Sequence, residues 1–409
     1  MPASPLHSGR PPRVLYSFPH RLGRSRICTT AWHEIDSAAA AGAQMQVIAG
    51  DCVRPFSRPI KIQRTFACGK LTIPYRLLGT RRMCILHDRM VAGMLPRLQG
   101  KIDIIHAWPL GALHTIRAAK RLGIPVALER CNAHTRFAYE AVRTECDRIG
   151  VKLPPGHEHE FNPDVLRHEE AEYNEADFLL CPSDFVVKTF VAERFPRQKL
   201  VRFIYGVDET KFRPSDEPRA AKPGLTMIFV GVCAVRKGLH FALEAWLKSP
   251  ASETGRFLIA GAFVPDYQQM LAPMLAHPSV QVLGHRDDIP ELMRNADLFV
   301  LPSIEEGFGL TCTEAMASGC VPLISDACTE VPRHGKHGFI HHVGDIAALT
   351  SHMTQLHEDR SLVESMRAAC ISETPNITWK AAGEQLVNAY GFALSRLGRP
   401  ALGVMAAQT

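Results

Sequence analysis

Short runs of apolar, often β-branched residues alternate with longer amphipathic stretches along the whole chain. Between the runs, apolar residues recur at helical spacing, for example over 30–41 and 238–247. Runs of four or five apolar residues without polar alternation are typical of strands that are buried on both faces. This alternation predicts parallel sheets covered by helices, and therefore an α/β protein. The apolar runs cover residues 14–18, 46–49, 102–106, 125–129, 178–181, 227–230, 257–260, 280–283, 298–301 and 321–325.

The runs form two series of five, separated by a charged segment rich in proline and alanine. Such a composition is typical of a linker. We therefore predict two Rossmann-like, doubly wound parallel-sheet domains that face a central cleft. The predicted divisions are a disordered lead-in over 1–12, an N-terminal domain over 13–204, a linker over 205–223, a C-terminal domain over 224–378, and a helical segment over 379–409 that crosses back to the N-terminal domain.

Length and composition agree with this organisation. A chain of 409 residues exceeds one ordinary core, and 46% hydrophobic with 22% charged residues is typical of a globular protein. No apolar run reaches the roughly 20 residues that a membrane-spanning helix needs. The 12 cysteines are scattered without a CxxC pair, which favours reduced, core-filling thiols and a cytoplasmic protein.

Charge is distributed unevenly along the chain. Residues 1–150 contain 23 Lys and Arg against 9 Asp and Glu, a net charge of +14, whereas the remaining residues carry −8. A basic N-terminal half indicates an anionic acceptor, a membrane surface or nucleic acid, or only a solvated basic face. The basic, amphipathic segment 77–98 could touch a membrane or pack as a helix on the sheet. No helix-turn-helix, zinc or aromatic RNA-binding signature occurs, so we expect no nucleic acid.

The most informative segment is 302–319, PSIEEGFGLTCTEAMASG. It predicts a loop after a buried strand, followed by a short helix. Gly307 and Gly309 leave room for a ligand at the amides of the helix N-terminus, where phosphate is favoured. Glu306 in the loop and Glu314 in the helix are suited to accept hydrogen bonds from sugar hydroxyls. Phosphate and sugar recognised together indicate a nucleotide sugar.

A second segment supports this interpretation. Residues 231–238, GVCAVRKG, follow a predicted strand and open a predicted helix. Arg236 and Lys237 are adjacent cations at this turn, and each charge-assisted contact to a phosphate contributes roughly 1.5–3 kcal/mol. Such contacts favour catalysis when the leaving group gains charge in the transition state.

Together with the turn at 338–340, these two segments resemble in order the donor-binding domain of the retaining GT-B glycosyltransferases of family 4, the group 1 glycosyltransferases. The E-x7-E spacing of Glu306 and Glu314 in segment 302–319 is part of this resemblance. Residues 205–214 are similar to the family's hinge, about which the domains would close, and 379–390 to its final helix. The resemblance is specific over about 200–394 and looser over 13–200.

The resemblance implies roles for individual residues. Arg236 and Lys237 would hold the diphosphate, and Glu314 would accept a hydrogen bond from the ribose. Glu306 would contact hydroxyls of the donor sugar, and His134 would be the cleft histidine near the reacting sugar. Glu306, His134, Lys237 and Arg236 thus form the predicted catalytic set. The remaining predicted substrate-binding positions are Arg130, Gly23, Gly284, His285, Gly307, Phe308, Gly309 and Leu310.

Two positions depart from the family pattern. Many members have an arginine directly after the glycine that ends the strand before the Arg-Lys turn, where this chain has Val232. Arg236 would supply the missing charge. The first loop usually carries a glycine pair, but residues 22–25 read LGRS.

The run His157-Glu158-His159-Glu160 offers side chains that ligate metals. Alternating positions on a polar loop are more often solvent-facing than ligating, and the resemblance implies no metal ion. We therefore expect no metal and no cofactor, with a nucleoside-diphosphate sugar as co-substrate.

The sequence predicts a cytoplasmic, metal-independent glycosyltransferase of polysaccharide biosynthesis. It would move a hexose to a hydroxyl of a glycan, lipid-linked or small-molecule acceptor, with retention of anomeric configuration. Peripheral contact of the basic N-terminal half with the inner face of an anionic membrane is a further expectation. A catalytically silent nucleotide- or sugar-binding GT-B protein, and a GT-B-like epimerase or phosphorylase, remain as alternatives.

Overall fold

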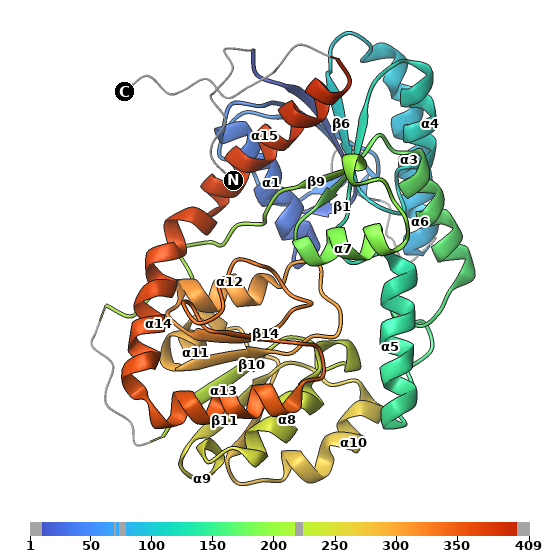
Figure 1. The fold of residues 1–409 in the computed structure, drawn as a ribbon. Coiled ribbons are helices and arrows are strands. Elements are labelled where there is room, and N and C mark those ends of the chain that lie inside the picture. The colour runs from blue at the N-terminus through green and yellow to red at the C-terminus, as the bar shows by residue number, and fades with distance from the viewer. Residues whose placement is uncertain (1–9, 69–70, 73–78, 217–223, 399–409) are drawn as a thin grey trace.

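The computed structural model describes residues 10–68, 71–72, 79–216 and 224–398. Two large sheets, each packed between helices, lie one above the other (Figure 1). Neighbouring strands within each of these two sheets pair in parallel. The α/β class predicted from the sequence is therefore confirmed.

The N-terminal domain is built on a seven-stranded sheet of order β3-β2-β1-β6-β7-β8-β9. Its strands are β1 (Arg13–Leu22), β2 (Gln44–Cys52), β3 (Lys61–Arg64), β6 (Ile104–Ala107), β7 (Val126–Glu129), β8 (Phe178–Cys181) and β9 (Leu200–Arg202), and β4 (Ala67–Cys68) and β5 (Leu71–Thr72) form a separate antiparallel pair. Its helices are α1 (Ile27–Ala40), α3 (Thr80–Met94), α4 (Leu113–Arg121), α5 (Thr135–Ile149), α6 (Pro163–Glu175) and α7 (Asp184–Ala192), with single turns η1 (Leu95–Arg97) and η2 (Arg197–Lys199).

The C-terminal domain is built on a six-stranded sheet of order β12-β11-β10-β13-β14-β15. Its strands are β10 (Thr226–Val230), β11 (Arg256–Ala260), β12 (Val280–Gly284), β13 (Leu298–Leu301), β14 (Val321–Ser325) and β15 (Phe339–His341). The helices are α8 (Leu239–Lys248), α9 (Ala251–Thr254), α10 (Pro265–Leu275), α11 (Ile289–Asn295), α12 (Leu310–Ala317), α13 (Ile346–Glu358), α14 (Arg360–Glu373) and α15 (Trp379–Arg396), with turns η3 (Val235–Lys237) and η4 (Thr374–Ile377).

Each of the ten apolar runs forms a strand, because the central strands are buried on both faces. Every residue of β6, β7, β8, β10, β13 and β14 is buried. The strands that the sequence did not predict are at or near the sheet edges. Strands β9 and β15 are only three residues long, and most of β3 is exposed, so none of the three produces a recognisable apolar run.

Helix α15 crosses back to the N-terminal domain and packs on α1 (Figure 1). Leu386, Tyr390 and Leu394 are buried in the apolar core of that domain. Just before this helix the chain pairs with the linker, where the backbone amide of Val207 donates to the carbonyl of Ile377 at 2.8 Å.

Helix α5 also connects the two domains, which the sequence did not predict. It begins in the N-terminal domain and runs down one side of the molecule to the C-terminal domain (Figure 1). Val142, Cys146 and Val151 belong to the same buried apolar cluster as the strands of the second sheet. Glu145 Oε1 on this helix lies 2.8 Å from Nε2 of His240 in α8.

Residues 10–12, at the end of the predicted disordered lead-in, are among the described residues. Arg10 Nη1 donates to Oδ2 of Asp103 at 2.7 Å, which anchors this part of the chain to the sheet. Residues 1–9 of the predicted lead-in, 217–223 of the predicted linker and 399–409 at the end of the chain lie outside the described residues.

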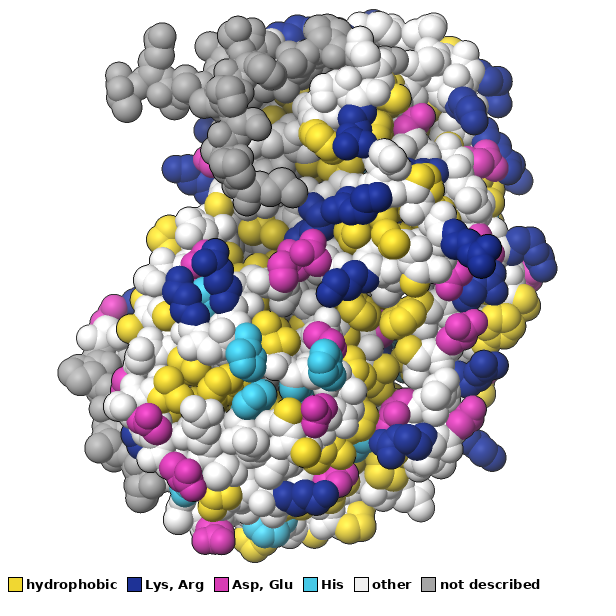
Figure 2. Space-filling model, in the orientation of Figure 1, with side chains coloured by type: hydrophobic (Ala, Val, Ile, Leu, Met, Phe, Trp, Pro, Cys, Tyr) yellow, Lys and Arg dark blue, Asp and Glu magenta, His cyan; other side chains and the backbone are white. Residues whose placement is uncertain are grey.

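Lys and Arg side chains follow the right-hand edge of the upper, N-terminal domain in Figure 2, where acidic side chains accompany them. Arg117 pairs with Glu175 at 2.6 Å, and Arg136 with Glu170 at 2.5 Å. Among the described residues, no helix has the length and apolar character that crossing a membrane requires.

Candidate functional site

The loop between β13 and α12 places two glutamates at the carboxyl edge of the second sheet. Strand β13 is fully buried, so polar side chains begin only where it ends, at the edge where parallel sheets bind ligands. Gly309 caps α12 with a φ of 80°, a left-handed conformation that favours glycine. Glu306 is 7% exposed, and Glu314 is half-buried on the first turns of α12.

The turn after β10 places two cations against this loop. Gly238 has a φ of 65°, and a Cβ there would lie 2.0 Å from the carbonyl oxygen of Pro302, so only glycine allows this approach. Lys237 Nζ binds Oε2 of Glu306. Arg236 Nη1 lies 3.7 Å from Oε1 of the same carboxylate. The Arg-Lys turn and the Glu306 loop therefore form a single charged unit.

Burial and these contacts set the charges of the carboxylates. Burial alone would raise the pKa of Glu306, but Lys237 and Arg236 outweigh it and lower this pKa to about 2. Glu306 is therefore ionised at neutral pH. Burial raises the pKa of Glu314 to about 7, against the attraction of Lys211, so Glu314 changes its charge near neutral pH.

A cavity of about 470 Å³ lies between the two domains at this point, within the size range of small-molecule sites. The N-terminus of α12 and the Arg-Lys turn form its C-terminal side. The predicted site residues that line it are Arg236, Lys237, Glu306, Phe308, Gly309, Leu310 and Glu314.

Gly307 brings the two domains into contact rather than lining the cavity. A Cβ on this residue would lie 1.6 Å from the carbonyl oxygen of Cys131, which follows β7 in the N-terminal domain. Ser183 Oγ, also in that domain, donates to the carbonyl of Gly307 at 2.6 Å. The loop that carries Glu306 is thus held against the opposite domain by backbone contacts.

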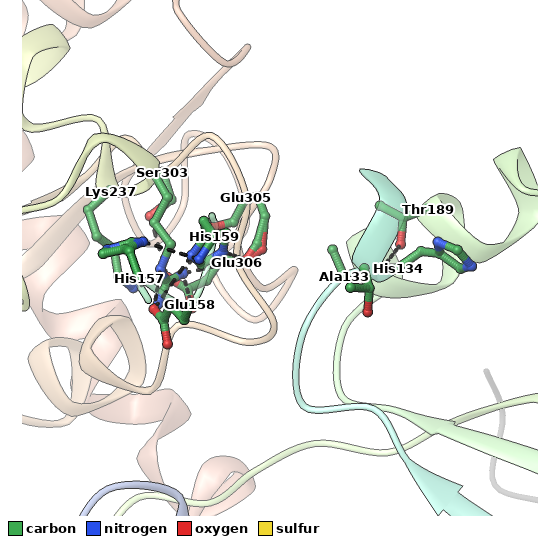
Figure 3. A network of polar contacts seen from close by, with 12 residues as sticks. Ala133, His134, His157, Glu158, His159, Thr189, Lys237, Ser303, Glu305 and Glu306 are labelled. Atoms are coloured by element: carbon green, nitrogen blue, oxygen red, sulfur yellow. Dashed lines mark hydrogen bonds and ion pairs between the residues drawn. The ribbon is translucent and has the colours of Figure 1, made fainter. Parts of the chain in front are cut away.

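His134 and Arg130 are not among the residues that line the cavity. The ring of His134 packs between Tyr173 and Phe190, with ring centres 5.3 and 4.9 Å away, and Figure 3 shows it turned away from the Glu306 cluster. Its Nδ1 caps α5 by accepting from the amide of Arg136. Arg130 is equally buried and forms an ion pair with Glu169 inside the N-terminal domain.

Gly23, Gly284 and His285 also lie outside the cavity lining. Gly23 has a φ of 80°, and a Cβ there would lie 2.5 Å from Cβ of Arg54, so it is needed for the turn that precedes α1. The side chain of His285 is 85% exposed on the loop after β12. No observation on the described residues tests the substrate-binding roles predicted for these three positions.

Sequence reasoning missed a group of residues that the N-terminal domain, the linker and the start of α15 contribute to the cavity. Two of them, Cys131 and Asn132, occupy the strand-end segment from which His134 was chosen. The linker residues lie in the segment predicted as a hinge between the domains, and this position could have indicated that they face the cavity. The group includes Arg26, His33, Cys131, Asn132, Tyr205, Asp208, Lys211 and Trp379.

In the run 157–160, Glu158 and Glu160 are exposed, as the sequence predicted for this loop, but His159 is not. His159 is 8% exposed and lies against the C-terminal domain. Within the described ranges, the group arranged to ligate a metal is Glu34, His106 and Glu129. All three side chains are buried, and each also contacts a tyrosine hydroxyl.

Comparison with known proteins shows which proteins this arrangement is similar to. Residues 224–359 match the family model described as glycosyl transferases group 1. Sulfoquinovosyl transferase SQD2 of Arabidopsis thaliana is 26% identical over 338 residues, covering 76% of this chain and 62% of that protein. D-inositol 3-phosphate glycosyltransferase of Mycobacterium bovis is 29% identical over 321 residues, covering 72% and 62%. The chain thus spans less than two thirds of the length of these relatives.

Solved structures show the same two-domain fold. Sucrose-phosphate synthase from Thermosynechococcus elongatus superposes with a TM-score of 0.65 at 16% identity, covering 93% of this chain and 98% of that one. HepE of Anabaena in complex with UDP superposes with a TM-score of 0.62 at 16% identity, covering 92% and 98%. The chain has the GT-B fold. Over its C-terminal domain the chain is similar to the group 1 glycosyltransferases, which supports the resemblance found in its sequence.

Proposed function

We propose that this chain transfers a sugar from a nucleoside-diphosphate sugar to a hydroxyl of an acceptor. The observation that carries the proposal is the convergence of Arg236, Lys237, Glu306 and the α12 N-terminus on one cavity between the domains. Two cations and free backbone amides suit a diphosphate, and a buried carboxylate suits sugar hydroxyls.

The reaction that we propose uses the leaving group as part of the machinery. The bond between the anomeric carbon and the diphosphate oxygen breaks, and the acceptor oxygen bonds to the same face of that carbon. The acceptor proton passes to the departing diphosphate, and because the new bond forms on the face that the diphosphate leaves, the configuration is retained. Arg236 and Lys237 would stabilise the developing negative charge, while Glu306 and Glu314 would position the sugar and the ribose.

The acceptor would enter from the N-terminal side, where Arg26 and Asn132 line the cavity. A hexose as the transferred sugar, and a glycan, lipid-linked or small-molecule acceptor, remain part of the proposal. We also propose that the transfer needs no metal ion. HepE is described in complex with UDP and with UDP-glucose, so uridine nucleotides are the first ligands to test.

The test is a thermal-shift screen of the chain with UDP, GDP, ADP, CMP and their sugar conjugates, with Lys237→Ala beside the parent. We expect one nucleoside diphosphate to raise the melting temperature of the parent and not that of the variant. The matching sugar nucleotide is then incubated with acceptors, with and without EDTA, and release of nucleoside diphosphate is measured. Stabilisation without release for any sugar conjugate would instead indicate a silent nucleotide-binding protein.

A further inference from the structure

The segment between α5 and α6, residues 150–162, reaches from the N-terminal domain to the Arg-Lys turn of the C-terminal domain; we call it the arm. Its root is fixed, because Val151 packs in the C-terminal core. Its tip is closed by a turn in which the amide of Gly156 donates to Glu160 at 2.5 Å. Figure 3 shows His157, Glu158 and His159 grouped with Lys237, Glu305 and Glu306.

His159 and Glu305 form the buried part of this contact. Nε2 of His159 lies 3.6 Å from Oε1 of Glu305, and the two side chains are 8% and 0% exposed. Arg236 Nη1 lies 3.6 Å from the same carboxylate oxygen and donates to the backbone carbonyl of Glu305 at 3.2 Å. Burial would raise the pKa of Glu305, but His159 and Arg236 reverse this and lower it. Glu305 is therefore a fixed negative charge that faces the arm and Arg236.

Glu158 forms the exposed part of the contact. Its Oε1 lies 3.5 Å from Nε of Arg236, but its side chain is 69% exposed, against 17% for Arg236. An ion pair whose acid remains in water is weak and easily exchanged, whereas breaking a buried pair is costly. Of the carboxylates around Arg236, Glu158 is therefore the one that an incoming anion replaces most easily.

We propose that the arm positions Arg236 for the donor diphosphate. His159 fixes Glu305, which orients the guanidinium, and Glu158 occupies the free side of Arg236 until a diphosphate takes its place. This proposal rests on the proposed function, because it requires a diphosphate to bind at Arg236. It makes His159 and Glu158 positioning residues that act through Arg236, in a segment that the sequence pattern assigned to solvent.

The first experiment measures the competition by Glu158. Calorimetric affinities for inorganic pyrophosphate, UDP, GDP and ADP are compared between the parent and Glu158→Gln at low salt. We expect the variant to bind pyrophosphate and the cognate nucleotide about two- to five-fold more tightly, as loss of an exposed competing ion pair predicts. The gain should shrink at high salt and disappear in an Arg236→Ala background.

Glu160→Gln is the matched control, because it removes the same charge from the same arm and its amide oxygen can still accept from Gly156. It should leave all affinities unchanged. Equal affinities of Glu158→Gln and the parent would overturn the role of Glu158, as would an equal gain in Glu160→Gln. A parent that binds no nucleoside diphosphate would contradict the proposed function itself, which separates the two failures.

The second experiment tests the positioning role of His159. In His159→Ala we expect pyrophosphate and nucleoside diphosphate to bind roughly five-fold or more weakly, while the corresponding nucleoside binds as in the parent. His159→Gln, whose amide can donate to Glu305, should restore most of the loss. Equal weakening for nucleoside and diphosphate would mean that His159 only supports the fold, and would overturn the proposal for this residue.

Discussion

Replacing Gly307 by alanine tests whether the two domains must touch for the site to form. The backbone of Gly307 is not left-handed, so alanine strains nothing locally. Its Cβ would lie 1.6 Å from the carbonyl oxygen and 2.6 Å from the carbonyl carbon of Cys131. Cβ contacts below 3.0 Å essentially never occur. Because both partners are backbone atoms, the two loops must separate by about 1.4 Å or more.

This separation breaks the 2.6 Å hydrogen bond from Ser183 to the carbonyl of Gly307 and moves Glu306, the preceding residue, away from the N-terminal domain. A misplacement of about 1 Å between reacting groups costs on the order of 100-fold in rate. We expect Gly307→Ala to lower kcat about 100-fold. The affinity for nucleoside diphosphate should change less than about three-fold, because its proposed contacts lie within the C-terminal domain. Steady-state kinetics and calorimetry measure the two quantities.

Gly309→Ala is the control, because here the new Cβ has space and the backbone conformation is the unfavourable factor. Its nearest neighbours would lie 3.4 and 3.5 Å from the new Cβ, so there is space, but its φ is 80°. A left-handed alanine costs roughly 1–2 kcal/mol, and this cost should appear as lower stability and weaker nucleotide binding at the α12 N-terminus. If Gly307→Ala keeps kcat within about three-fold of the parent, the contact between the domains is not required and the reasoning is refuted.

Three other substitutions test the charges of Glu306 and Glu314 and the position of His134. Glu306→Gln removes a carboxylate whose pKa is about 2, so kcat should fall about 100-fold at every pH from 6 to 9. A smaller loss of kcat at the acidic end of this range would show that Glu306 is neutral there. Burial raises the pKa of Glu314 to about 7. The contribution of this group to the free energy of unfolding is therefore complete below its ordinary pKa and is lost as pH rises through about 7. The melting temperature of the parent should fall over this pH range, and Glu314→Gln should make that fall smaller. His134→Asn keeps an acceptor for the α5 cap but leaves space beside Tyr173, so urea unfolding should show a loss of about 1–3 kcal/mol with kcat nearly unchanged; normal stability with a large loss of kcat would return His134 to the site.

The sheets were predictable because strands that are buried on both faces consist of continuous runs of apolar residues. The strand and turn segments that hold Glu306, Glu314, Arg236 and Lys237 were predictable for a related reason. Their backbones need glycine where chains approach closely, as at Gly238 against Pro302, and the charged residues follow at fixed spacing. These features depend on neighbours in sequence and can be read without knowing how the domains meet.

The position of His134 could not be predicted from neighbouring residues alone. Several polar residues follow β7, and only the path of the turn decides which one faces the cavity. His134 becomes the cap of α5 and turns into the aromatic cluster, and Asn132 is left in the cavity lining. The environment of His159 was hidden for the same reason, since nothing in its own segment shows that α5 crosses to the other domain.

The connections between the domains bear on how the cavity forms. Beside the Gly307 contact, Glu330 of the C-terminal domain accepts from the amide of Asp184 at 2.9 Å. A Cβ at Gly206 would lie 2.4 Å from Cα of Trp379, so the linker is packed against the start of α15 rather than extended as a loose tether. Together with the crossing of α5, these contacts fix the domains at separate points. Any opening or closing of the domains about the linker must therefore break or rearrange these contacts.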